Sequence, residues 1–176
     1  MGKDEYAYVI EYLPHGMMDS KDHKASAIIL TDSLSLLVAA TKKDVVLEPD
    51  KKVYIGENKR DEIHHIIGRI RPEKLSGSGK ERLVNLIARR VKEDEQKFTA
   101  IINVLGPVNV RLNSLELIPN IGKKMMQRII EERKKQPFLS YEDINNRLQL
   151  PSSIEKDIAE RIMEELEGKD KYRIFT

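Results

Sequence analysis

Cysteine is absent from this chain, and no hydrophobic run is long enough to cross a bilayer. Without thiols the chain cannot form a disulfide or a thiolate zinc site, which favours a reducing compartment. The most apolar stretch, AIILTDSLSLLVAAT, is too short for a membrane span and is interrupted by Asp32. The opening residues, MGKDEYAYVIEY, lack the basic and apolar regions of a secretory signal. We therefore expect a cytoplasmic protein with no membrane partner.

Signatures of catalysis and of metal or cofactor binding are also missing. No Ser-His-Asp order, metal-ligand spacing or glycine-rich cofactor loop occurs along the chain. His64 and His65 are adjacent, so in a strand their side chains would point to opposite faces and would not share a metal. His15 and His23 lie in predicted loops with Asp19 and Asp22 nearby, and this group is a second, weaker candidate for a metal site. We expect neither an enzyme nor a bound metal or cofactor.

Composition predicts a folded core beneath an ionic surface, because apolar residues make up 40% of the chain and charged residues 34%. The formal net charge is only +2. Residues 1–73 carry 11 Lys or Arg against 13 Asp or Glu, whereas residues 74–176 carry 20 against 16. The basic excess therefore belongs to the second part of the chain, but an asymmetry this mild does not identify a partner.

Residues 1–73 have the pattern of short β-strands separated by turn-forming residues. β-Branched and aromatic residues are concentrated in five segments, and Pro, Gly, Asn and Asp lie between them. Five strands at this spacing predict a small closed or nearly closed β-barrel, since closure removes exposed strand edges. Barrels of the oligonucleotide-binding (OB) and SH3-like kinds both have about this size. The predicted strands are 6–13, 26–32, 35–41, 51–57 and 62–70.

The first predicted strand places three tyrosines, Tyr6, Tyr8 and Tyr12, on one face together with Ile10. Two interpretations of this face remain open. In the first, which we favour, the tyrosines fill or rim the barrel core. In the second they are exposed and stack nucleic-acid bases.

A stretch rich in Pro, Ser and Gly follows the barrel, and we interpret residues 74–80 as a linker. Residues 81–176 then have the apolar spacing that is typical of helices. The chain is thus expected to be α+β, with a β-barrel domain at 1–73 and an all-α, SAM-like domain at 81–176. The expected helices lie at 80–98, 98–105, 109–118, 123–135, 140–148 with Ser140 as N-cap, and about 153–167 with Gly168 at its end.

The sequence LELIPNIGKKMMQRIIEER, residues 115–133, predicts a helix, a short turn and a second helix. Pro119 would end the first helix because it lacks an amide donor. Asn120 is the kind of residue that best tolerates a left-handed backbone conformation. Ile121 would pin the two helices together, and Gly122 would let a partner approach the backbone closely.

The second helix begins immediately after this turn, at Lys123 and Lys124. The first amides of a helix have no intrahelical acceptor, and the helix dipole adds a partial positive charge there. Two ammonium groups beside these amides would complete a site for an oxyanion, and nothing in that site reaches a base edge. This arrangement predicts binding of nucleic-acid backbone largely without sequence preference.

A second copy of this segment follows 33 residues later, where IEKDIAERIMEE (154–165) aligns with IGKKMMQRIIEE (121–132). Two basic positions are kept and two others become acidic. The aligned pairs are Lys123 and Lys156, Arg128 and Arg161, Gly122 and Glu155, and Lys124 and Asp157. We therefore expect the second copy to bind phosphate poorly and to pack against the first.

Residues 111–165 resemble a tandem helix-hairpin-helix domain, with units at about 111–135 and 141–167. Many repair, recombination and competence proteins use this domain as a nonspecific grip on nucleic acid. Those families usually have Pro-Gly-hydrophobic-Gly at the turn, and this chain has Asn120 in place of the first glycine. The resemblance implies that backbone amides at the turn contact phosphate, a role that by position would fall on Ile121, Gly122, Lys123 and Lys124.

Over almost its full length the chain also resembles an archaeal family of unknown function, domain-of-unknown-function family 655. The likeness is carried by VIEYLPHG, GRIRPEKLS and LGPVNVRLNSLELIPNIGKK. This resemblance implies an OB-like barrel ahead of a helix-hairpin-helix region. It also implies RNA as the ligand, because the family is described in those terms.

These observations predict a non-enzymatic nucleic-acid-binding protein, with RNA favoured over DNA only through the resemblance. The β-barrel would supply a second contact surface, although surface solvation explains its basic residues equally well. The alternatives are a protein–protein interaction adaptor and a non-catalytic partner of a nucleic-acid-processing enzyme. The predicted contact residues are Asn120, Ile121, Gly122, Lys123, Lys124 and Arg128 at the hairpin, and Lys59, Arg60, Arg69 and Arg71 in the first part.

Overall fold

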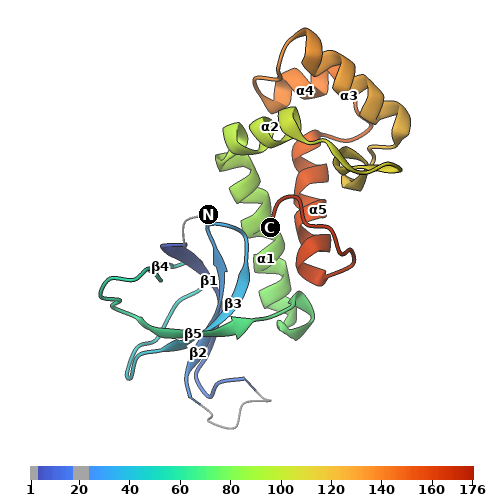
Figure 1. Cartoon of the computed structure of the whole chain (residues 1–176). Helices are drawn as coiled ribbons and strands as arrows, with labels where there is room; N and C mark the ends of the chain where they lie inside the picture. The colour runs from blue at the N-terminus through green and yellow to red at the C-terminus, as the bar shows by residue number, and fades with distance from the viewer. Residues whose placement is uncertain (1–3, 18–23) are drawn as a thin grey trace. The chain divides into compact units, whose positions relative to one another are not determined.

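The computed structural model describes residues 4–17 and 24–176. Within these residues the chain is a mixed α+β protein with a five-stranded antiparallel sheet, a two-stranded sheet and five α-helices (Figure 1). No helix in this described part has the length and apolar character needed to cross a membrane. The chain divides into two compact units. The first comprises Met1–Leu86, Glu165–Lys171 and Thr176, and the second comprises Ile87–Glu164 and Tyr172–Phe175.

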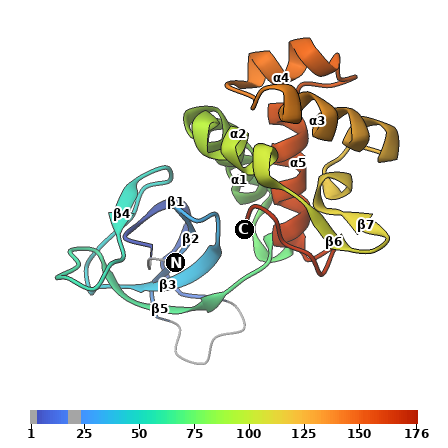
Figure 2. The ribbon, with the colours of Figure 1, turned by 45° about the horizontal axis from the view of Figure 1, so that its top comes forward.

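The five-stranded sheet lies in the first unit and curls into a half-barrel (Figure 1 and Figure 2). Its strand order is β4-β1-β2-β3-β5, and every neighbouring pair is antiparallel. The prediction of five strands is confirmed, but β4 and β5 are the two edges of an open sheet. The strands are β1 (Tyr6–Leu13), β2 (Ser26–Thr31), β3 (Leu36–Thr41), β4 (Lys52–Tyr54) and β5 (Ile63–Arg69).

One cluster of core residues of the first unit lies on the inner face of the curled sheet, and the outward residues Ile28 and Leu30 of β2 are buried as well. Alternate residues of the strands point inward, as a pleated strand requires, and all six residues of β2 are buried. The inward cluster is formed by Ala7, Val9, Ala27, Ile29, Ala39, Leu47, Val53, Ile55 and Ile63.

A β-bulge in β1 separates Tyr12 from the other two tyrosines of the strand. The pairing register with β2 shifts between Val9 and Glu11, so the residues beyond the bulge change face. Tyr12 consequently packs against the inward cluster and donates its hydroxyl hydrogen to the Val45 carbonyl oxygen (3.0 Å). The prediction that Tyr6, Tyr8 and Tyr12 share one face is therefore wrong for Tyr12, which is a core residue.

The segment expected to be a linker is instead structured. A 3₁₀ turn, η1, covers Pro72–Lys74, and α1 begins at Gly77 and continues to Glu93. The Ser76 amide donates to the Glu11 carboxylate (3.2 Å), and a Cβ at position 79 would come within 2.6 Å of that carboxylate. The glycine at 79 thus permits a close approach to β1, and the boundary between the units falls within α1 after Leu86.

The second unit is mainly helical, and most of its helices begin and end near the predicted residues. Helix α3 covers Lys123–Lys135, as predicted. Ser140 caps α4 (Tyr141–Leu148) by accepting a hydrogen bond from the Asp143 amide (3.0 Å). Helix α2 covers Glu95–Val104, and α5 covers Ile154–Glu167 ahead of Gly168, whose φ is +72°.

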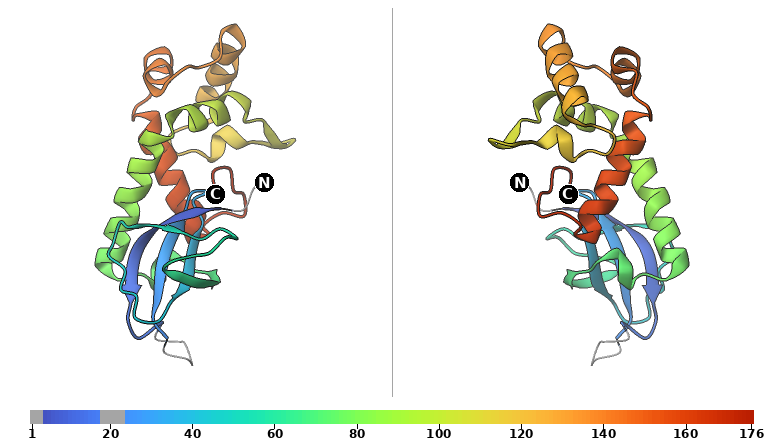
Figure 3. Two further views of the ribbon diagram at one scale, coloured as in Figure 1. Left: turned by 90° about the vertical axis from the view of Figure 1, so that its left-hand side faces the viewer. Right: turned by 90° about the vertical axis from the view of Figure 1, so that its right-hand side faces the viewer.

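The expected helix at 109–118 is not an α-helix. The chain there forms a short hairpin of β6 (Pro107–Asn109) and β7 (Leu112–Asn113), followed by the 3₁₀ helix η2 (Ser114–Leu117). Leu112, Leu115 and Ile118 recur every three residues, which is the period of a 3₁₀ helix rather than an α-helix. The β6–β7 hairpin projects as a narrow arm (Figure 3).

Buried hydrogen bonds tie the helices of the second unit together. The Arg133 guanidinium donates to the carbonyl oxygens of Ile102 (2.8 Å) and Leu105 (2.7 Å), which lie at the end of α2 and lack intrahelical donors. The buried Tyr141 hydroxyl donates to the Val91 carbonyl oxygen (2.7 Å), and the Tyr141 amide donates to Glu95 (2.6 Å). Burial, with a smaller effect of the nearby Glu95 charge, raises the pKa of Tyr141 well above its ordinary value.

We predict that Tyr141→Phe lowers the free energy of unfolding by about 1–2 kcal/mol at neutral pH, because the Val91 carbonyl oxygen loses its donor. The raised pKa means that the folded state holds the phenolic proton more tightly than the unfolded state. Wild-type stability should therefore fall as the pH rises above about 10, the ordinary pKa of tyrosine, and the fall should be smaller in Tyr141→Phe. Denaturation followed by far-ultraviolet circular dichroism tests this, and equal alkaline losses would contradict it.

Candidate functional site

The turn ahead of α3 has the backbone geometry that its sequence predicts. Asn120 adopts a left-handed conformation with a φ of +63°. The Ile121 amide donates to the Ile118 carbonyl oxygen (3.1 Å), which closes the turn. Ile118 and Ile121 are both buried, so the two isoleucines hold the turn against the rest of the unit.

The Asn120 side chain connects this turn to the second copy of the segment. Its amide nitrogen donates to the Asp157 carboxylate (2.9 Å) and to the Ser152 hydroxyl (3.3 Å). The Ser152 hydroxyl also donates to Asp157, whose side chain is only 1% exposed. Helix-hairpin-helix turns usually have glycine at this position. Asparagine suits it here because it adopts the same left-handed backbone conformation and adds side-chain contacts that glycine could not make.

Helix α3 begins without a cap. Its N-cap residue is Gly122, so no side chain is present to accept the first amides, and the first turn contains no acidic residue. In the described part of the chain, the Met126 amide makes the first helical bond, to the Gly122 carbonyl oxygen (2.9 Å). Gly122, Lys123 and Lys124 are exposed. The amides at the start of α3 are thus neither capped nor covered, and they lie beside two ammonium groups.

Nothing in the described part of the chain requires glycine at position 122. Its φ of −84° and ψ of 179° are open to any residue, and a Cβ built there would meet no atom within 4 Å. The absence of a side chain therefore leaves open space directly in front of the first turn of α3.

A groove of about 250 Å³ adjoins this helix start on the side of the β6–β7 hairpin. Lys123, Met126 and Gln127 line it from α3, and Arg111 lines it from the hairpin. Glu116 also lines it, but its carboxylate accepts the Asn113 amide (3.0 Å). Sequence reasoning missed Arg111. The only local signal is Asn109, whose side-chain oxygen accepts the Arg111 amide (2.9 Å) and so forms the turn of the hairpin.

Among the predicted contact residues, Asn120, Ile121 and Gly122 lie in the turn ahead of α3, and Lys123, Lys124 and Arg128 lie on α3 itself. Arg128 is exposed on α3 one turn beyond Lys124, so the two cations lie on the same side of the helix. Lys123, at the uncapped helix start itself, lines the groove together with Arg111.

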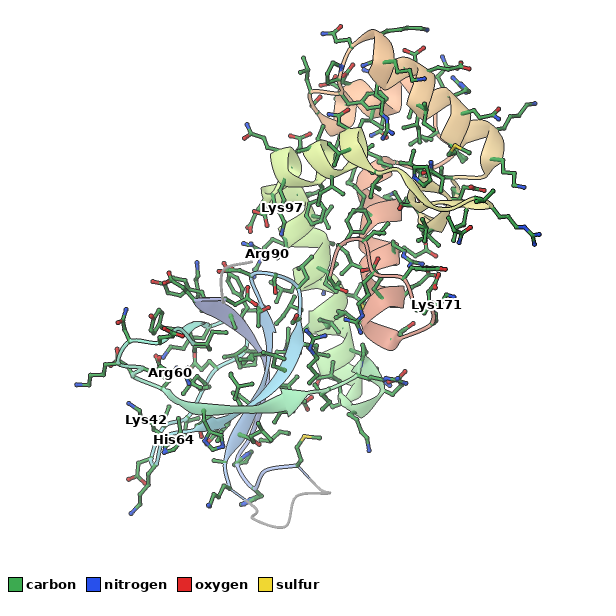
Figure 4. All side chains as sticks on the ribbon, in the orientation of Figure 1. Lys42, Arg60, His64, Arg90, Lys97 and Lys171 are labelled. Atoms are coloured by element: carbon green, nitrogen blue, oxygen red, sulfur yellow. The ribbon has the colours of Figure 1, made fainter. Side chains whose placement is uncertain are left out.

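The four predicted residues of the first unit do not form a comparable cluster. The Arg60 guanidinium donates to the carbonyl oxygens of Gly56 (2.8 Å) and His64 (3.4 Å), and its own carbonyl oxygen accepts Lys42 (Figure 4). Arg60 therefore organises the loop between β4 and β5. The Arg71 guanidinium lies over Gly168, about 3.4 Å from where a Cβ would be. Lys59 and Arg69 are exposed, on that loop and on β5 respectively.

The start of α5, the second copy, is occupied from within the molecule. The Ile154 amide donates to the Asn145 side-chain oxygen (2.9 Å), and the first turn carries Glu155 and Asp157. Arg161, which aligns with Arg128, is 3% exposed and donates to the Tyr172 carbonyl oxygen (2.6 Å). The second copy thus lacks both the free amides and the surface cations of the first.

The prediction that His64 and His65 face opposite ways is wrong. A register shift in the pairing of β5 with β3 lies between Ile63 and His65, and the two rings turn toward each other. Their Nδ1 atoms are 2.8 Å apart. No group of three or more His, Asp or Glu suited to a metal occurs among the described residues, which include the candidate His15, and the other candidates Asp19, Asp22 and His23 lie outside them.

Comparison with known proteins finds relatives over almost the whole chain. The model of a family of proteins of unknown function (DUF655) matches residues 3–176. The uncharacterized protein MJ0038 of Methanocaldococcus jannaschii is 37% identical over 176 residues, which cover 98% of this chain and 80% of that protein. The crystal structure of Af1531 from Archaeoglobus fulgidus, also described as DUF655, is similar with a TM-score of 0.82. It is 36% identical, over 98% of this chain and 99% of that one.

We predict that Asn120→Gly lowers the free energy of unfolding by about 1–2 kcal/mol, since the turn is kept while the bond to the Asp157 carboxylate is lost. Asn120→Ala should cost about 1 kcal/mol more, because alanine is strained in the left-handed conformation. Urea denaturation of both variants measures separately the loss of the Asp157 contact and the cost of backbone strain in alanine. An Asn120→Gly protein as stable as wild type would show that the contact with Asp157 contributes nothing.

Proposed function

The chain belongs to the DUF655 family of proteins of unknown function, and within that frame we propose that it is a non-enzymatic nucleic-acid-binding protein. In this proposal the start of α3 holds a phosphate of the nucleic-acid backbone. The observation that carries it is the uncapped, exposed and acid-free first turn of α3, flanked by Lys123 and Lys124. Binding is largely independent of sequence, because these groups contact phosphate and not base edges.

The physical basis is the set of amides that a helix leaves without acceptors at its start. Most helices satisfy them with a serine, threonine, aspartate or asparagine at the N-cap. Here the N-cap is a glycine, and the nearest side chains are cationic. An anionic oxygen from outside the molecule is the partner that suits both the amides and the helix dipole.

In this proposal the segment from η2 to α3 is a helix-hairpin-helix in which the first helix is the short 3₁₀ helix η2. Two features support it. Asn120 has the positive φ that this turn needs. The two copies are joined through Asn120 and Asp157, as expected of a duplicated unit in which one copy supports the other.

The sheet of the first unit is proposed to be OB-like and to supply a second contact surface. Its order β4-β1-β2-β3 is that of a Greek key, in which the fourth strand returns beside the first. A Greek-key arrangement of five strands that remains partly open is the architecture of the OB class. RNA is preferred over DNA as the ligand through the family resemblance alone.

One observation favours the alternative of a protein–protein interaction adaptor. Val104, Val110 and Leu139 are exposed apolar residues of the second unit, and Val110 is fully exposed at the tip of the β6–β7 hairpin. A partner protein that covers them would remain bound after nuclease treatment of a pull-down. Loss of all captured partners on nuclease treatment would instead favour nucleic acid as the ligand.

We predict that replacing Lys123 and Lys124 together by alanine flattens the slope of log affinity against log salt concentration by about 1–2 units, because two fewer counterions are released. The matched control is Lys156→Ala. Lys156 aligns with Lys123, is exposed, and lies on α5 beside an occupied helix start. Titration of RNA and DNA oligonucleotides at several salt concentrations tests this. An unchanged slope in the double variant would remove the start of α3 from the contact surface.

A further inference from the structure

Three tyrosines and one lysine gather on the outer face of the half-barrel, where β1 pairs with β4. The register places Tyr6 opposite Tyr54 and Tyr8 opposite Lys52. The neighbouring residues Ala7 and Val53 belong to the inward cluster, so Tyr6, Tyr8, Tyr54 and Lys52 point to the opposite side of the sheet. We refer to these four residues as the tyrosine patch.

The rings of the patch are packed edge to face and carry a cation. The Tyr6 and Tyr54 ring centroids are 5.4 Å apart at an interplanar angle of 68°. The Lys52 ammonium nitrogen lies 4.6 Å from the Tyr6 ring centroid and 5.7 Å from that of Tyr8. A protonated amine over aromatic faces is an electrostatically favourable arrangement, and it puts a positive charge directly beside flat apolar surface.

The ring of Tyr54 is held in position by the chain around it. Its hydroxyl oxygen accepts the Asn58 amide (3.3 Å). The ring lies so close to Gly56 that a Cβ there would collide with it. Tyr54 therefore supports the Tyr6 ring that packs against it. Tyr6 itself is 39% exposed, so part of its ring faces solvent.

Tyr12 provides a contrast within the same strand. It packs into the inward cluster, and its hydroxyl is used by Val45, so it is a structural residue. In the tyrosine patch, Tyr6 is exposed, and Tyr8 and Tyr54 are half-buried. Exposed aromatic rings beside a cation are the elements with which proteins bind single-stranded nucleic acid, because bases stack on the rings and the cation contacts the backbone.

We propose that the tyrosine patch stacks an unpaired base, and that the protein is therefore a binder of single-stranded nucleic acid. This inference rests on the proposed function and deepens it by naming the class of ligand. Tyr6 supplies the stacking surface, Tyr54 holds it, and the Lys52 ammonium contacts the adjacent phosphate. A base paired within a duplex is stacked between its neighbours and does not offer a free face to Tyr6.

The patch suits a base better than a cationic ligand such as a methylated lysine. The Lys52 ammonium already lies beside the rings of Tyr6 and Tyr8. A second cation would be repelled by it. An uncharged base joined to an anionic phosphate is attracted to both parts of the patch.

The test compares a short single-stranded oligonucleotide with an abasic strand of the same length and number of phosphates. Wild-type protein should bind the strand with bases more tightly, by about fivefold or more, the effect of stacking one base. Tyr6→Leu should lose this preference, whereas Tyr6→Phe should keep it because the ring remains. Tyr12→Phe, which changes only a core hydroxyl, should behave as wild type.

A second measurement does not depend on any substitution. The chain contains six tyrosines and no tryptophan, so its intrinsic fluorescence comes from tyrosine. Stacking should quench part of this emission when the strand with bases is added and should not do so with the abasic strand. Equal affinity of Tyr6→Leu and wild type for the strand with bases, or no quenching, would overturn the inference.

The outcomes also separate this inference from the proposed function. If the Lys123 and Lys124 substitutions change the salt dependence while the preference for bases is absent, the patch is excluded and the α3 site stands. If wild-type protein binds neither strand at any salt concentration, both are overturned.

Discussion

The hydrogen bond from the Asn120 side chain to the buried Asp157 carboxylate is the contact on which the candidate site depends. It holds the turn ahead of α3 against the second copy of the duplicated segment, and Asn120 must remain in a left-handed conformation to make it. Asp157 and Ser152 engage the Asn120 side chain, and the N-cap position of α3 is a glycine, so among the described residues no side chain caps this helix. The contact with Asp157 holds the turn in place, and the first amides of α3 remain without an acceptor.

The duplication explains why the two copies have different chemistry on a shared sequence pattern. In the first copy Gly122 leaves the amides bare, and Lys124 and Arg128 remain on the surface. In the second copy Asp157 and Arg161, which occupy the positions of Lys124 and Arg128, are both buried and bonded within the unit. The second copy thus has a structural role. Of the two helix starts, that of α3 is exposed and flanked by cations.

The sequence predicted the helix ends, caps and turns that depend on residues close to one another in the chain. The bounds of α3, the Ser140 cap of α4 and the left-handed Asn120 follow from capping and turn preferences of single residues. Features set by distant neighbours were missed. The bulge that moves Tyr12 into the core and the shift that brings His64 to His65 depend on pairing with β2 and β3. Arg111 joins the site only because residues 107–113 form a hairpin where a helix was expected.

The central claim is that the bare amides at the start of α3 bind phosphate, and the affinity of a Gly122→Ser variant for single-stranded nucleic acid tests it most directly. A serine at the N-cap accepts these amides itself and should raise the free energy of unfolding by a few tenths of a kcal/mol. None of the described residues obstructs it, since a Cβ at position 122 would meet no atom of theirs within 4 Å. We predict that this capped and slightly more stable protein binds about tenfold more weakly, because charge-assisted hydrogen bonds to phosphate are lost. Wild-type affinity in the capped variant would contradict it.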